Sequence, residues 1–300
     1  RLSALRLHNI KNVVNGTITM PNTAKKNLTA EGAEILGIYG QNGSGKTAIV
    51  DALYFLQKIM TGESLDGEFG DYIEANSAQA EIEADFYIFK GAIMYEVSYF
   101  LHLKKNEQTV VIEKEILSSA KNEAGKRSNK IPFMNYERNN LDVIFTPKKR
   151  LDELVGANKE NLTDLIVAKK LAEKSNSSYI FGESSREVFD KNTEGAFAEY
   201  SYIIHALFDF AIRDLFVIRN SHSGVITANF ILPMAFRIDG DKAGMKGDFV
   251  VPLTQPVLLN KDRKAILEAI VEQINTVLYT IIPGLMIAIK DYGPQLLDSG

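Results

Sequence analysis

The residues Gly40–Thr47 have the types and spacing needed to hold a chain of phosphates. They read Gly-Gln-Asn-Gly-Ser-Gly-Lys-Thr and match the pattern G-x-x-x-x-G-K-S/T at every position. Glycines in such a loop let backbone N–H groups turn inward around a phosphate, because no side chain stands in the way. The helix expected to begin near Lys46 points the positive end of its dipole at the same place. The sequence therefore predicts a nucleotide site, and we call these residues the phosphate loop.

Two side chains of the phosphate loop supply further chemistry. Lys46 carries a mobile ammonium group that can reach the β- and γ-phosphates, which makes it the candidate catalytic residue. The hydroxyl of Thr47 is the candidate ligand for Mg²⁺. The other candidate nucleotide-binding residues of the loop are Gly40, Asn42, Gly43, Ser44 and Gly45. ATP and Mg²⁺ are therefore the predicted cofactors.

The elements on either side of the loop fit this interpretation. Ile35–Tyr39 is a short apolar run, typical of a strand buried on both faces of a parallel sheet. From Ala48 to Met60 the apolar residues recur at helical spacing, and Gly62 is expected to end that helix. The order strand, loop, helix makes a chance match to the motif improbable.

Strands are expected before and after this unit. Ala4–Ile10 and Asn12–Met20 read as two strands, with Asn15-Gly16 as the hairpin turn signal. Over Gln79–Leu117 apolar and polar residues alternate, which predicts an antiparallel meander of about three strands with one face in water. The polar stretch Lys121–Lys130 is expected to be a hairpin tip or a disordered loop.

The second half of the chain is mostly helical in pattern. Helices are predicted over Asp152–Glu173 and Gly195–Ile218, the latter rich in apolar and aromatic residues on nearly all sides. Val225–Ile238 looks extended. A last helix is expected from its cap at Asn260 as far as Pro283, and Leu285–Asp291 looks like another strand.

Composition excludes several classes of protein. Of 300 residues 45% are hydrophobic and 24% are charged, which excludes wholesale disorder. The net charge of -4 excludes a globally basic nucleic-acid binder, although a local basic patch remains open. Cysteine is absent, so disulfides, thiolate metal sites and a cysteine nucleophile are excluded. No segment is long and apolar enough to span a membrane, and a cytoplasmic protein is expected.

Within the phosphate-loop proteins, a GTPase is not expected, because Asn158–Asn161 ends in the wrong residue for the base-reading motif. The opening Leu5–Val13, with the letters LRLHNIKNV, instead resembles the first strand and turn of the RecF, SMC and Rad50 branch of ABC-type ATPases. That branch has L-x-N-F-K/R-S at this place, so Ile10 stands for the usual Phe and Asn12 for the usual Ser. Ile38–Thr47 resembles most closely the bacterial ATPases related to the overcoming-lysogenisation-defect family, many of which serve in phage defence.

This resemblance implies an α/β fold of the ABC-ATPase type, with a mixed sheet, an antiparallel β-subdomain and a helical subdomain. The expected domains are an ATP-binding lobe at 1–145, a helical subdomain at 146–220 and a return to the ATPase core at 221–300. The resemblance also implies that Lys11 or Asn12 contacts the nucleotide from the first hairpin. A solvated turn lysine is an equally good interpretation of Lys11.

Parts of a hydrolysing cassette are missing from the sequence. No apolar strand ends in Asp-Glu, and nothing matches the signature motif or the switch histidine. Leu207-Phe208-Asp209 lies inside a helical pattern instead. We expect these parts to be encoded beyond residue 300 or to be supplied by a partner chain.

The resemblance implies an ATPase that forms a homodimer, or a higher oligomer, around ATP. Its output would be control of an effector nuclease or toxin in anti-phage defence, with DNA as a possible partner and no membrane. The alternatives are a DNA-repair ATPase like RecF and Rad50, or a nucleotide-gated assembly module with little hydrolysis. Three short basic stretches could touch DNA, although solvated surface is the favoured interpretation: Lys126-Arg127, Lys148-Lys149-Arg150 and Lys169-Lys170.

Overall fold

The structure is a computed structural model that describes residues 1–24, 35–65, 67–106, 109–140, 152, 160–192, 195–215, 217, 272, 275–276, 279, 285–290 and 293–298. The chain divides into two compact units, Arg1–Arg219 and Asn220–Gly300. The phosphate loop lies in the first unit.

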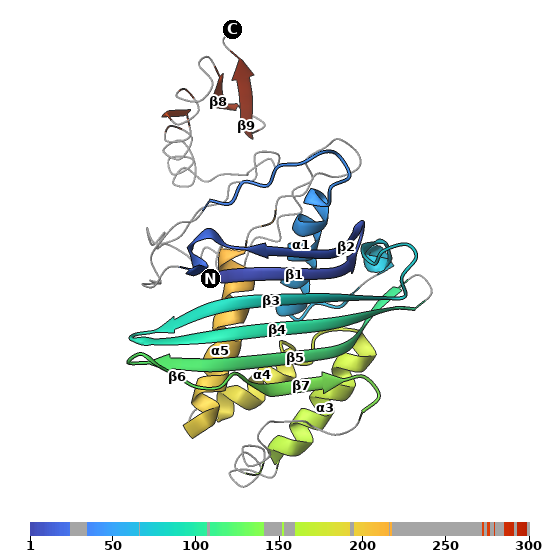
Figure 1. The fold of residues 1–300 in the computed structure, drawn as a ribbon, viewed down its shortest axis with the longest axis vertical. Coiled ribbons are helices and arrows are strands. Elements are labelled where there is room, and N and C mark those ends of the chain that lie inside the picture. Colours follow the sequence, from blue (N-terminus) through green and yellow to red (C-terminus); the bar gives the residue numbers. More distant parts are fainter. Residues whose placement is uncertain are drawn as a thin grey trace. The chain divides into compact units, whose positions relative to one another are not determined.

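A seven-stranded antiparallel sheet forms the scaffold of the first unit (Figure 1). Its strands are β1 (Leu2–Ile10), β2 (Val13–Thr19), β3 (Gln79–Lys90), β4 (Ile93–Asn106), β5 (Thr109–Glu123), β6 (Lys126–Arg127) and β7 (Ile131–Glu137). They lie in the order β2-β1-β3-β4-β5-β6, and β7 also pairs with β5. The predicted meander is thus confirmed as β3, β4 and β5, and the predicted hairpin tip is the turn between β5 and β6. Every pairing among the described residues is antiparallel, so the mixed sheet stays a prediction.

Alternation along β3 explains why one face of the sheet is covered. Ile82, Ala84 and Phe86 are buried, whereas Glu83 and Asp85 between them are partly exposed. Because successive side chains of a strand point to opposite faces, the apolar set meets the helices and the charged set meets water.

Helices cover the apolar face of the sheet. They are α1 (Lys46–Met60), α3 (Glu160–Ser175), α4 (Glu183–Lys191) and α5 (Gly195–Asp209), with short 3-10 turns η1 (Pro21–Ala24) and η2 (Gly67–Tyr72) and a π-helical turn η3 (Phe210–Asp214). Figure 1 shows α1 and α5 crossing the strands on one face of the sheet. Phe86 of β3 packs edge-to-face on Phe210, with ring centroids 5.4 Å apart. The helix predicted from Ala48 to Met60 is confirmed as α1, and Gly62 follows its end with φ +77°.

The last helix of the first unit is shorter than predicted. The pattern indicated a helix through Ile218, but regular helix ends at Asp209 and Leu215 is extended. The amide of Gln57 in α1 donates to the carbonyl oxygens of Ala211 at 2.9 Å and Leu215 at 2.6 Å. These bonds satisfy carbonyls that a longer helix would use itself, so tertiary contacts end the helix here.

The first hairpin turns earlier than predicted. Ile10 pairs with Val13, so the turn is formed by Lys11 and Asn12, and Asn15-Gly16 lies inside β2 opposite His8 and Leu7. The signal Asn-Gly favours a turn locally, but Lys11 and Asn12 make contacts far along the chain that fix the turn at their position.

The predicted buried strand before the phosphate loop is wrong for the described residues. Ile35–Tyr39 has no regular structure, and Ile35 and Tyr39 are 93% and 94% exposed. Burial on both faces requires neighbouring strands, and no described strand pairs with this run. Leu36 and Ile38 of this run line a cavity of about 300 Å³. The other residues that line it are Leu2, Ala4, Leu5, Ile18, Met20, Ile49 and Leu53.

In the second unit, β8 (Leu285–Lys290) and β9 (Gly293–Asp298) form an antiparallel hairpin, which confirms the strand predicted at 285–291. Residues 272, 275, 276 and 279 of the predicted last helix are helical, and Val225–Ile238 lies outside the described residues. Within the described part of the chain, no helix combines the length and apolarity that crossing a membrane requires.

Candidate functional site

Two glycines of the phosphate loop adopt backbone angles that favour glycine. Gly43 has φ +84° and Gly45, which precedes α1, has φ +90°. A Cβ atom on Gly45 would lie 2.6 Å from Cγ2 of Val13, closer than such atoms approach in proteins. Both the angle and the close approach of the β1–β2 turn therefore require glycine at position 45.

The start of α1 is open to an anion. The residue before α1, Gly45, has no side chain to cap the first backbone N–H groups of the helix. Residues 40–44 and Thr47 are exposed, so a ligand can reach them from solvent. Helix N-termini of this kind favour negative charge, because unsatisfied N–H groups and the helix dipole act together.

Two donors of the loop converge on one carbonyl oxygen. The ammonium group of Lys46 donates to the carbonyls of Gly40 and Gln41, each at 2.6 Å. The backbone N–H of Ser44 donates to the same oxygen of Gln41 at 3.2 Å. The loop thus places a cation and a backbone donor where they share an acceptor, and a charged phosphate oxygen is a stronger acceptor than a carbonyl.

Thr47 suits the metal that a nucleotide brings with it. Its side chain lies on the exposed first turn of α1, beside Lys46. Among the described residues, no group of three or more His, Asp or Glu side chains could hold a metal ion. Mg²⁺ often binds through phosphate oxygens, water and few protein ligands, and one hydroxyl beside a phosphate site fits that chemistry.

The two hairpin residues expected at the nucleotide have different positions. The ammonium group of Lys11 forms an ion pair with Asp51 of α1, whose side chain is 3% exposed, and lies 5.1 Å from the centroid of the Tyr72 ring. Asn12 donates its side-chain amide to the carbonyl of Gly43 in the phosphate loop. The structure therefore brings Asn12 to the loop backbone and turns Lys11 toward α1, and a nucleotide contact by either stays a prediction.

The sequence analysis did not identify Asp51 as a residue of this site. It lies on the apolar stripe of α1, between the buried Ala48 and Phe55. An acidic residue on an otherwise apolar stripe was the available signal, because a buried carboxylate requires a partner.

The basic stretches do not form a common patch among the described residues. Arg127 makes two bonds to the carboxylate of Glu96, at 2.8 Å and 2.7 Å. Lys169 is buried and donates to the carbonyl of Asn140, while Lys170 is exposed. Lys148-Lys149-Arg150 lies outside the described residues. The favoured interpretation of solvated surface is confirmed for Arg127, whereas it is wrong for Lys169, which is buried.

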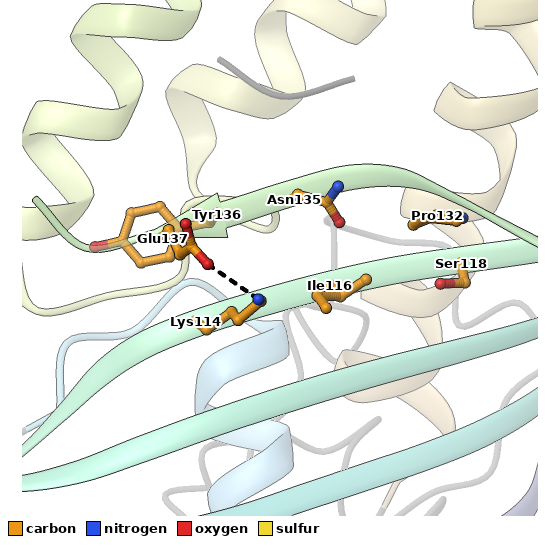
Figure 2. A pocket seen from close by; sticks show the side chains of 7 residues that line it. All are labelled: Lys114, Ile116, Ser118, Pro132, Asn135, Tyr136 and Glu137. Carbon is orange, nitrogen blue, oxygen red and sulfur yellow. Dashed lines mark hydrogen bonds and ion pairs between the residues drawn. The ribbon is translucent and has the colours of Figure 1, made fainter. Parts of the chain in front are cut away.

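A second hollow lies between β5 and β7 on the face of the sheet away from the helices (Figure 2). Its volume is about 320 Å³, and a 3.0 Å ion pair between Lys114 and Glu137 closes one end. The side-chain oxygen of Asn135 is buried there without a hydrogen-bond partner among the described residues. The pairing register shifts at Leu117/Ser118, beside this hollow, where Ser118 pairs with Pro132 of β7. No phosphate-loop residue lines it.

Two comparisons place these features among known proteins. A family model described as an AAA domain matches residues 4–215. The DNA replication and repair protein RecF of Deinococcus radiodurans is 35% identical over 85 residues, which is 28% of this chain. The matched stretch spans 20% of the length of that relative.

Proposed function

Since the chain belongs to the AAA-domain family and resembles the RecF and SMC type of phosphate-loop ATPase, we propose that it binds ATP with Mg²⁺ on the phosphate loop and hydrolyses it. The observation that carries the proposal is the convergence of the Lys46 ammonium group and the Ser44 N–H on the oxygen of Gln41. This acceptor position lies just before the open start of α1, where an anion is favoured.

On ATP binding, the donors of the loop would exchange carbonyl oxygens for phosphate oxygens as their acceptors. Lys46 would leave the carbonyls of Gly40 and Gln41 for the β- and γ-phosphate oxygens, and the N–H of Ser44 would follow to the same anion. The Thr47 hydroxyl would hold Mg²⁺, which neutralises charge on the phosphate oxygens. Hydrolysis also needs a carboxylate that activates water. Asp51, which lies on α1 beside the loop, is paired with Lys11, so we propose that another part of the chain or a partner chain supplies this group.

A titration of ATP and Mg²⁺ into wild-type protein and Lys46→Ala tests the site by calorimetry. The variant removes the mobile cation from the loop, so we expect ATP affinity to fall at least about tenfold, or about 1.4 kcal/mol. Lys104→Ala is the matched control, because that exposed lysine lies on β4. Equal ATP affinity in wild type and Lys46→Ala would contradict the proposal.

For the biological role we propose a DNA-linked ATPase first. The support is the 35% identity to a relative whose name describes DNA replication and repair. The role in phage defence rests on the residues Ile38–Thr47 alone and remains the second candidate. A gel shift with double-stranded DNA, with and without ATP, tests the first candidate, because a repair clamp predicts ATP-dependent DNA binding. Binding that is absent, or that does not depend on ATP, would contradict it.

A further inference from the structure

We infer that Asp51 is a positioning residue of the phosphate loop, which acts through the turn between β1 and β2 without touching the nucleotide. The inference rests on the proposed function and names a further residue for the same site.

Asp51 first fixes the turn from the side of α1. Its side chain is 3% exposed, and its carboxyl forms an ion pair with Lys11, whose side chain is 28% exposed. A buried carboxylate without a cation would be strongly disfavoured, so the ion pair holds Lys11 against the helix. The aromatic ring of Tyr72, 5.1 Å from the ammonium group, favours the same position.

The other side of the turn is fixed by backbone bonds. The N–H of Lys11 donates to the carbonyl of Tyr72 at 2.7 Å, and the N–H of Glu74 donates to the carbonyl of Asn9 at 2.9 Å. Asn9 and Lys11 have φ of +53° and +51°, a region that costs free energy for residues other than glycine. The surrounding contacts must offset that cost, and the ion pair to Asp51 is one of them.

The turn held in this way contacts the phosphate loop at two points. Asn12 donates its amide to the carbonyl of Gly43, and Val13 lies against Gly45. The carbonyl and the N–H of one peptide unit point in opposite directions. When Asn12 binds the oxygen of Gly43, the N–H of Ser44 is therefore turned away from Asn12, to where it meets the oxygen of Gln41.

The phosphate loop needs this support because the residues that lead into it are not held in a helix or strand. Residues 35–41 are exposed and lie outside helices and strands, so α1 and the β1–β2 turn provide the hydrogen-bonded support of the described loop. Asp51 thus holds Lys11, and the turn that contains Lys11 places Asn12. Asn12 then binds Gly43 and so orients the N–H of Ser44. Loss of the ion pair lets the loop sample other conformations, and ATP affinity falls because binding must then order the loop.

The test is a double-mutant cycle on ATP affinity, measured by calorimetry, with Asp51→Asn and Asn12→Ala. We expect each single variant to bind ATP about tenfold more weakly and the double variant to be no weaker than the weaker single variant, since both act along one path. Asp164→Asn is the matched control, because this partly exposed acid of α3 pairs with Lys191 on α4, and it should bind as wild type. Thermal unfolding is recorded for each, and Lys11→Gln replaces Asp51→Asn if the latter does not fold.

The outcomes separate the two proposals. Independent, additive losses in the cycle, or wild-type affinity in Asp51→Asn and Lys11→Gln, overturn the positioning role while Lys46→Ala still reports on the site. Absence of ATP binding by the wild-type protein overturns the proposed function itself, and the positioning role with it.

Discussion

Glu115 shows how one buried side chain joins the sheet to the helical layer. Its carboxylate accepts hydrogen bonds from the hydroxyl of Tyr99 at 2.6 Å and from the backbone N–H groups of Tyr179 at 2.8 Å and Ile180 at 3.3 Å. Burial raises the pKa of Glu115, and these hydrogen bonds oppose the rise without cancelling it. The side chain therefore ties β5 to the segment before α4 at a cost in charge burial.

The raised pKa of Glu115 predicts a dependence of stability on pH. In the folded protein the carboxyl binds a proton more readily than in the unfolded chain, whose pKa is near 4.5. Its contribution to stability is therefore complete below about pH 4.5 and is lost as pH rises through the folded pKa. Glu115→Gln cannot titrate, so the decline in the free energy of unfolding above pH 4.5 should be smaller in this variant. Urea unfolding at several pH values measures this, and parallel pH profiles would refute it.

How far apart two contacting residues lie in the sequence decided how much of the site could be predicted. The phosphate loop was recognisable because its chemistry is local, within eight consecutive positions. The ion pair of Lys11 with Asp51 joins positions 40 apart, and the bond of Tyr179 to Glu115 joins positions 64 apart. Such pairs depend on how the elements pack, which local residue patterns do not specify.

At the scale of elements, periodicity was a reliable guide where packing follows from it. The meander β3-β4-β5 and the helix α1 were predicted because their apolar positions recur with the period of the element. The Asn15-Gly16 turn and the buried strand Ile35–Tyr39 were wrong, because a turn can be fixed by distant contacts and burial depends on neighbours.

The packing of α1 gives a prediction of its own. Leu56 is fully buried between α1 and the rest of the core, whereas Leu171 on α3 is 50% exposed. Leu56→Ala leaves a cavity, so we expect the free energy of unfolding to fall by about 2–5 kcal/mol. Leu171→Ala, the same change at an exposed position, should shift it by less than about 0.5 kcal/mol. Chemical denaturation compares the two, and equal losses would show that α1 does not pack as described.

At the scale of the whole molecule, the homodimer around ATP that the sequence resemblance implies predicts a change of assembly. Analytical ultracentrifugation of the wild-type protein should show a dimer with ATP and Mg²⁺ and a monomer with ADP. Lys46→Ala should remain monomeric under both conditions, since it lacks the ammonium group that holds the phosphates. A wild-type protein that binds ATP tightly yet stays monomeric would contradict closure by a second copy and favour a partner of another kind.

The side-chain amide of Gln57 connects α1 to the last described residues of the first unit. Gln57 lies on α1, whose first turn belongs to the phosphate loop. Its side-chain amide donates hydrogen bonds to the carbonyls of Ala211 and Leu215, near the end of the first unit at Arg219. Gln57 lies about three helical turns after Lys46, or about 16 Å along the axis of α1. The same helix therefore contributes to the phosphate loop at its first turn and holds the last turn of the first unit's helical segment near its end.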